Sequence, residues 1–121
     1  MTNYEELLHR ARDILYKHIN TELKKDNVLY TYFFDTTTIN WVNIKKDSVT
    51  LQFVINRSIS SNCPAIDILN DLFLQLFGRK LSKSKNYDKS KSMPYFIIYS
   101  RLTLTYEELS YVYTYLSLKY R

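Results

Sequence analysis

The stretch of sequence that decides the fold runs from Phe33 to Leu81 and reads FFDTTTINWVNIKKDSVTLQFVINRSISSNCPAIDILNDLFLQLFGRKL. Apolar and polar residues alternate over 39–44 and again over 49–54, and the polar residues 45–48 separate the two runs. Such a pattern is typical of an antiparallel hairpin. Because a helical pattern follows the hairpin, the stretch predicts an α+β fold, in which helices pack on a small sheet.

The helix after the hairpin has clear signals at both of its ends. Residues 56–62 are polar and predict a loop, and Pro64 suits the first helical turn, where its missing N–H has no partner to lose. Gly78, the only glycine of the chain, predicts the end of the helix because glycine takes a positive φ without strain. The apolar stripe expected to face the core consists of Ala65, Ile68, Leu69, Leu72, Phe73 and Leu76.

An amphipathic helix is predicted ahead of this stretch. Thr2 and Glu5 form a capping-box pattern, and apolar residues recur at helical spacing as far as Ile19. The polar run 24–27 ends this helix. The following segment, 28–38, is ambiguous, because its β-branched and aromatic residues favour a strand while several of its apolar residues stand at helical spacing.

Three further elements are predicted beyond Gly78. Residues 79–92 are polar and rich in lysine, which indicates a connecting loop, and the apolar run 95–99 is typical of a strand buried on both faces. Thr105 and Glu108 repeat the capping-box pattern and predict the start of a last helix. The apolar positions of that helix are Leu109, Val112, Tyr113, Leu116 and Tyr120.

Length and composition exclude several classes of protein. A chain of 121 residues predicts one domain, 1–121, with its core at about 4–99 and an extra C-terminal helix at about 105–120. Cys63 is the only cysteine, which excludes an internal disulfide, and the single glycine argues against a phosphate-binding loop. The sequence has no apolar run long enough for a membrane span and no signal-peptide pattern, so we expect a cytoplasmic protein.

Catalytic and metal-binding patterns are missing from the sequence. His9 and His18 lie on the same predicted helix but are too far apart to bind one metal ion. Cys63 has no histidine near it in the sequence. Asp67 and Asp71 are close to a predicted helix N-terminus, where a carboxylate favours the helix dipole rather than acid–base chemistry. We therefore expect no enzymatic activity, no cofactor and no metal.

The order of the predicted elements resembles the N-terminal domain, domain I, of the bacterial replication initiator DnaA, over roughly residues 4–99. Phe33 or Phe34 falls where that family carries an aromatic residue on its second helix. Asn56 matches the asparagine that follows the second strand, and Gly78 matches the glycine that ends the long helix. Apolar positions of the second strand, the long helix and the closing strand are matched by Val49, Leu51, Phe53, Leu69, Leu72, Phe73, Leu76, Phe96, Ile97 and Ile98.

The resemblance implies a KH-like arrangement in which residues 29–36 form a helix rather than a strand. It also implies a protein-interaction module of replication initiation that self-associates, recruits the replicative helicase, binds regulators and contacts single-stranded DNA weakly. The family's ATPase module and helix-turn-helix have no counterpart in the chain, which would then be a fragment of an initiator or a free-standing relative. The partner contacts that the resemblance implies are Leu7, Leu8, Tyr30, Phe33, Ile59 and Asp67.

The lysine-rich segment supports an alternative function. It holds six basic residues and the single acid Asp88, so that its charge of six minus one, or +5, equals the net charge of the whole chain. A basic cluster with a tyrosine in it suits phosphate contacts and base stacking, although an exposed loop without function has the same composition. The alternative is a small single-stranded nucleic-acid-binding protein of a virus or plasmid, which would use Arg79, Lys80, Lys83, Lys85, Tyr87, Lys89 and Lys91.

Overall fold

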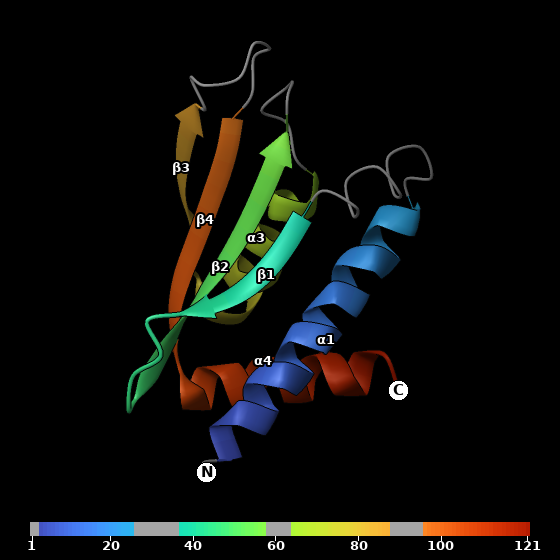
Figure 1. Ribbon diagram of the computed structural model, residues 1–121. Helices are drawn as coiled ribbons and strands as arrows, with labels where there is room; N and C mark the ends of the chain where they lie inside the picture. Colours follow the sequence, from blue (N-terminus) through green and yellow to red (C-terminus); the bar gives the residue numbers. More distant parts are fainter. Residues whose placement is uncertain (1–2, 26–36, 58–63, 88–95) are drawn as a thin grey trace.

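The computed structural model describes residues 3–25, 37–57, 64–87 and 96–121, and these residues form helices around one antiparallel sheet, as predicted for an α+β protein (Figure 1). None of the helices in these ranges combines the length and the apolar character needed to cross a membrane. The elements in chain order are α1 (Asn3–Lys25), β1 (Thr37–Val42), β2 (Ser48–Arg57), α3 (Pro64–Phe77), β3 (Ser82–Tyr87), β4 (Phe96–Thr105) and α4 (Tyr106–Lys119).

The four strands are arranged in the order β1-β2-β4-β3, and every neighbouring pair is antiparallel. The two long strands, β2 and β4, form the centre of the sheet. In the view of Figure 1, α3 lies behind the sheet, α4 runs beneath its lower end and α1 passes beside β1. The core lies between the sheet and these helices, and its largest fully buried side chains include Phe53, Phe73, Leu15 and Leu109.

The predicted hairpin is confirmed by the pairing of β1 with β2, in which Ile39 lies opposite Phe53. The turn between the strands is closed by the Lys45 N–H, which donates to the Ser48 carbonyl at 2.8 Å. Asn43 has a φ of 49°, a left-handed conformation that asparagine tolerates better than most residues. The loop predicted at 56–62 is wrong for its first two residues, since β2 continues through Arg57 by pairing with β4.

The ends of α3 and the start of α4 confirm the signals read from the sequence. Pro64 is the first residue of α3, and Gly78, with a φ of 69°, follows its last residue. The Gly78 N–H donates to the Leu74 carbonyl at 2.9 Å, which satisfies one of the last carbonyls of the helix. At the other helix, the Glu108 N–H donates to the Thr105 hydroxyl and the Glu108 carboxylate accepts from the Thr105 N–H, both at 3.0 Å.

Two predictions in the second half of the chain need correction. Residues 79–92 were predicted as a loop, but 82–87 form strand β3, which pairs with β4. The strand predicted at 95–99 begins at Phe96 and extends to Thr105, and its added part alternates buried leucines with exposed polar residues. Tyr99 is the one residue of that predicted run whose burial the structure describes, and it is half-buried rather than buried. The backbone of β3 completes the hydrogen bonds that β4 needs on its second edge.

Helix α1 covers the outer edge of β1. The Ile39 N–H, which points away from β2, donates to the Tyr16 hydroxyl at 2.6 Å, and the Trp41 indole N–H donates to the Leu8 carbonyl at 2.8 Å. These contacts satisfy donors that an uncovered edge strand would leave open. The segment 26–36, which includes the helix implied at 29–36, and the capping residue Thr2 lie outside the described residues.

Candidate functional site

The main candidate site is a groove at the turn end of the hairpin, with a volume of about 420 Å³. It forms where the first two turns of α1, the β1–β2 turn and the first residue of α4 meet. Most of its accessible lining is apolar. We call it the hairpin groove, and it is lined by Tyr4, Glu5, Leu8, Ile44, Lys45, Lys46 and Tyr106.

Two stacked tyrosines are part of the lining of the hairpin groove. The rings of Tyr4 and Tyr106 are parallel within 2°, with centroids 3.8 Å apart. Tyr106 is only 6% exposed, and its hydroxyl donates to the Lys45 carbonyl at 2.8 Å. Burial raises the pKa of Tyr106, so the hydroxyl keeps its proton and remains a donor. The stack and the hydrogen bond together hold α1, α4 and the hairpin turn in one fixed arrangement.

The groove presents apolar side chains to solvent. Ile44 is 59% exposed and Tyr4 is 42% exposed, although both are large hydrophobic residues. Strand β1 ends at Val42, and Asn43 then takes its left-handed conformation, so Ile44 stands in the turn and outside the sheet. Large exposed apolar side chains beside a pocket are a common feature of interaction surfaces.

The lining of the groove carries two cations and one carboxylate, while Asp47 and Glu107 line the adjoining cavity that shares Tyr4 and Tyr106. Lys45 and Lys46 are exposed, and neither forms an ion pair with any residue that the structure describes. Glu5 is the one carboxylate in the lining. The exposed apolar surface is therefore bordered by two cations whose charges are not neutralised within the described part of the chain.

A second, polar cavity of about 120 Å³ lies between α1, α3 and α4. Its most buried polar residue is His18, which is 5% exposed and whose Nδ1 is hydrogen-bonded to the Tyr120 hydroxyl. Burial, followed by the charge of Lys119, lowers the pKa of His18 to about 4. The lining consists of His18, Glu22, Ile68, Asp71, Leu72, Gln75 and Lys119. His18 is neutral at physiological pH and connects two helices, which is a structural role.

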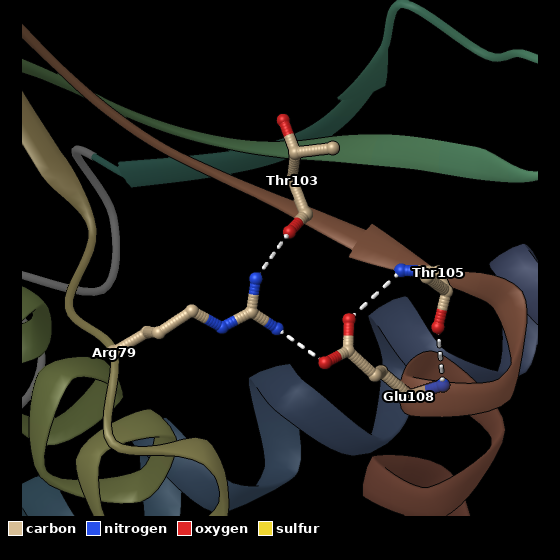
Figure 2. A network of polar contacts seen from close by, with 4 residues as sticks. All are labelled: Arg79, Thr103, Thr105 and Glu108. Carbon is tan, nitrogen blue, oxygen red and sulfur yellow. Dashed lines mark hydrogen bonds and ion pairs between the residues drawn. The ribbon is translucent and has the colours of Figure 1, made fainter.

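Figure 2 shows a polar network that joins the end of α3 to β4 and α4. Arg79 donates to the Thr103 carbonyl at 3.1 Å and to the Glu108 carboxylate at 2.5 Å. Partial burial acts to raise the pKa of Glu108, but hydrogen bonds from Thr105 and Arg79 outweigh it and hold the pKa below its ordinary value. The charge of Arg79 is therefore largely neutralised by Glu108.

The structure separates the partner-binding residues that the resemblance implies. Leu8 is buried and lines the hairpin groove, and Leu7 is half-buried beside it in the sequence of α1. Asp67 is exposed on the first turn of α3 and is not part of the groove. Three further residues implied by the resemblance, Tyr30, Phe33 and Ile59, lie outside the described residues.

The residues proposed for nucleic acid are also divided. Arg79 belongs to the network of Figure 2, while Lys80 is exposed just before β3. Strand β3 contains Lys83, Lys85 and Tyr87, and Lys89 and Lys91 lie outside the described residues. Part of the lysine-rich segment therefore belongs to the sheet. The described residues do not form the single loop that the sequence predicted.

Sequence reasoning missed Ile44 and Tyr106 as site residues. Ile44 was assigned to the alternation of the hairpin, and Tyr106 follows a capping residue without any motif of its own. The one signal for Ile44 as a site residue was its position directly before the lysine pair that begins the predicted turn. Among the described residues, no group of three or more His, Cys, Asp and Glu side chains is placed to hold a metal ion.

Comparison of the chain with protein-family models, with curated proteins and with solved structures finds no match. The resemblance to the DnaA domain therefore stays a prediction from the sequence.

Proposed function

We propose that this chain is a non-enzymatic protein-interaction module whose hairpin groove docks an amphipathic, acidic segment of a partner protein. The observation that carries the proposal is the exposure of Ile44 and Tyr4 beside a groove that is mainly apolar. Burying a whole isoleucine side chain contributes about 1.5 to 3 kcal/mol. A partner that covers the exposed part of Ile44 gains a sizeable fraction of that amount, and the Tyr4 ring adds to it.

The groove is preorganised for binding. Tyr106 is fixed by its hydrogen bond to the Lys45 carbonyl and by its stack with Tyr4, so neither the turn nor the ring has to be ordered when a partner arrives. Rigid binding surfaces lose less conformational entropy on association, which leaves more of the contact energy as affinity. This favours a preformed docking site over a site that folds on binding.

The two lysines in the lining of the groove, Lys45 and Lys46, favour an acidic partner. Lys45 and Lys46 lack acidic partners among the described residues, so carboxylates on the docked segment would meet unpaired cations. Exposed ion pairs contribute roughly 0.2 to 1 kcal/mol each and act mainly on specificity and association rate. The expected contact is weak for one copy and becomes strong when several copies bind together.

The resemblance to the DnaA domain supplies the biological setting for this proposal. It would place the chain in replication initiation, where the docked segment belongs to the replicative helicase or to a regulator, and where the module self-associates. Leu8, which the resemblance implies as a partner contact, lines the hairpin groove. The groove proposal does not depend on this setting, because it rests on the exposure and charge of its own residues.

A peptide titration followed by NMR tests the groove. We expect an amphipathic peptide with leucines and glutamates to shift the resonances of Tyr4, Ile44 and Tyr106, and a peptide with lysines in place of the glutamates to bind less well. Ile44→Ser should weaken binding about fivefold or more, in line with the lost apolar contact. Leu118→Ser is the matched control, because Leu118 is 59% exposed like Ile44 but lies on α4 outside the groove.

The two levels of the proposal fail separately. If the acidic peptide leaves the three groove residues unchanged, or if Leu118→Ser weakens binding as much as Ile44→Ser, the groove is not the docking site. Co-purification of the chain with its cognate replicative helicase, and loss of that complex in Ile44→Ser, tests the setting in replication. If the peptide binds and the helicase does not, the groove remains a docking site and the proposed role in replication is rejected.

A further inference from the structure

The face of the sheet that points away from the core forms a second surface, which we call the outer sheet face. Its described residues include Asn40, Thr50, Gln52, Val54, Tyr99, Arg101 and Thr103, which alternate along the strands with the apolar core residues. Asn40, Arg101 and Thr103 are exposed, Val54 and Tyr99 are half-buried, and Thr50 and Gln52 are buried. One row of the pairing register crosses all four strands, from Asn40 through Gln52 and Arg101 to Ser82. Figure 1 shows no described helix in front of this face.

The outer sheet face carries positive charge and no described carboxylate. Arg101 is exposed and forms no ion pair with any residue in the described ranges. Most positions around it are hydroxyl and amide side chains, which offer hydrogen bonds without charge, and the half-buried Val54 is apolar. A ligand with anionic groups and hydrogen-bonding edges would complement this surface, whereas a basic or purely apolar ligand would not.

The guanidinium of Arg101 is held in place by its neighbours. Its Nε donates to the Gln52 amide oxygen at 2.7 Å, and the group lies 5.9 Å from the centre of the Tyr99 ring. The side chain is thus oriented through Nε, and its two terminal nitrogens have no described acceptor. Paired N–H groups of this kind bind phosphate oxygens in a bidentate manner. The Thr50 and Thr103 hydroxyls, 2.9 Å apart, form a second polar pair on the same face, two register positions nearer the start of β2.

We propose that the outer sheet face binds single-stranded nucleic acid, with Arg101 on a phosphate and Tyr99 beneath an unstacked base. Four-stranded sheets that present aromatic rings on an open face bind single strands in this way, because every base has a flat surface that stacks on a ring. The Asn40 amide and the Thr103 hydroxyl, which are both exposed, would meet base edges and sugars. An acidic peptide would satisfy Arg101 but has no flat base to occupy the position next to Tyr99.

This site differs from the lysine-rich segment that the sequence suggested. The proposal moves the central contacts to the middle of the sheet, onto β2 and β4, and leaves Lys80, which is exposed just before β3, as a neighbouring charge at one side. It also differs from the hairpin groove, which is lined by residues of α1, the β1–β2 turn and α4. Loss of one binding activity should therefore leave the other intact.

Fluorescence anisotropy with a short labelled oligothymidine tests the proposal on the full chain. We expect binding that weakens with salt, with a slope of about −0.7 per phosphate contact in a log–log plot. Arg101→Ala should weaken binding about tenfold, and Arg101→Lys should restore only part of it, since lysine cannot make the bidentate contact. Tyr99→Leu should weaken binding about fivefold or more, while Tyr99→Phe, which keeps the ring, should bind like the natural chain.

Arg10→Ala is the matched control for charge, because Arg10 is an exposed arginine on α1, paired with Glu6 and away from the sheet. It should change affinity less than about twofold, as expected for one distant charge under salt screening. Far-UV circular dichroism of each variant checks that the fold is intact, and Ile44→Ser should bind the oligonucleotide normally.

Three outcomes would overturn the proposal. The first is no binding at low salt, which would mean that the outer sheet face is simply the solvated side of an antiparallel sheet. The second is normal binding by Arg101→Ala together with loss of binding when Lys83, Lys85, Lys89 and Lys91 become alanine, which would assign nucleic acid to the lysine-rich segment. The third is equally tight, Arg101-dependent binding of a glutamate-rich peptide, which would make the partner a protein.

Discussion

The hydroxyl of Tyr120, at the end of α4, is hydrogen-bonded to Nδ1 of His18 in the middle of α1. The ring of Tyr120 also lies against that of His18, with centroids 5.7 Å apart, and Lys17 contacts it from the side of α1. The C-terminal helix is therefore connected to the first helix of the chain through a buried histidine. This contact has consequences for stability that can be measured.

Stability should depend on pH through His18. Its pKa in the folded chain is about 4, against 6.5 for the unfolded reference, so the unfolded chain binds the proton more readily. The stabilisation is complete above pH 6.5 and is lost as the pH falls from 6.5 towards 4, with a total of about 1 to 3 kcal/mol. Glu22, Lys25 and Lys119 also act on His18, and the pKa of Glu22 is lowered chiefly by its hydrogen bond to Lys25.

Urea unfolding at a series of pH values measures this dependence. Glu22 and Glu108 have lowered pKa values in the folded chain, and their unfolded carboxyls begin to bind protons only about one pH unit above their reference of 4.5. The loss between pH 6.5 and about 5.5 therefore belongs to the histidine. The chain has two histidines, and His9→Gln is the control, since His9 is exposed and paired with Asp13. If the pH dependence of the free energy of unfolding disappeared in His9→Gln, or persisted in His18→Gln, His18 would not be its source.

Tyr120→Phe should destabilise the protein by about 1 to 3 kcal/mol. The substitution keeps the ring but leaves the buried Nδ1 of His18 without its partner, which costs the desolvation of that nitrogen. Thermal unfolding at neutral pH provides the measurement. Tyr111→Phe serves for comparison, because Tyr111 is 53% exposed on the same helix and its substitution should change stability by less than about 0.5 kcal/mol.

Glu108→Ala should cost more stability than Arg79→Ala. The Glu108 carboxylate accepts from Arg79 and from the Thr105 N–H, so Glu108→Ala also opens the capping box at the start of α4. Arg79→Ala removes the bonds to Glu108 and Thr103 and a contact with the Phe77 ring, but it leaves the capping box intact. We expect about 1 to 2 kcal/mol for Glu108→Ala. A double-mutant cycle should give a coupling energy of about 0.2 to 1 kcal/mol that falls with salt, because the pair is partly exposed. Zero coupling at low salt would exclude the ion pair of Figure 2 in solution.

Gly78→Ala should destabilise the protein by about 1 kcal/mol through the backbone alone. Gly78 has a φ of 69°, which an alanine adopts only with strain, while a Cβ at this position would meet no atom within 4 Å. Gly78→Asn should therefore cost less than Gly78→Ala, since asparagine tolerates the left-handed region. Chemical unfolding of the two variants measures both losses of stability. If Gly78→Asn cost as much as Gly78→Ala or more, the cost would not be purely conformational.

Local signals in the sequence were sufficient for much of the fold. The alternation over 39–44 and 49–54 predicted the hairpin, and Pro64 and Gly78 predicted the limits of α3. The Thr105–Glu108 capping box predicted the start of α4. Each of these signals acts within a few residues, because strand alternation, capping and glycine conformation depend on neighbouring backbone atoms.

Strand β3 shows where local signals fail. Its residues, SKSKNY, have no apolar alternation and a composition that suits a loop. They form a strand because β4 presents a row of unpaired backbone groups that must find hydrogen-bond partners, and the chain beyond Gly78 runs alongside it. The partner strand, rather than the segment's own residues, decides this part of the sheet.

The sequence by itself determined the α+β class, the hairpin, the ends of α3 and the capped start of α4, because each depends on interactions between near neighbours. Only the tertiary structure decided the two candidate surfaces. The hairpin groove needs Tyr4 and Tyr106 from opposite ends of the chain to stack, and the outer sheet face needs Gln52 and Arg101 from separate strands to meet. Packing of distant segments creates such sites, and no pattern of neighbouring residues records it.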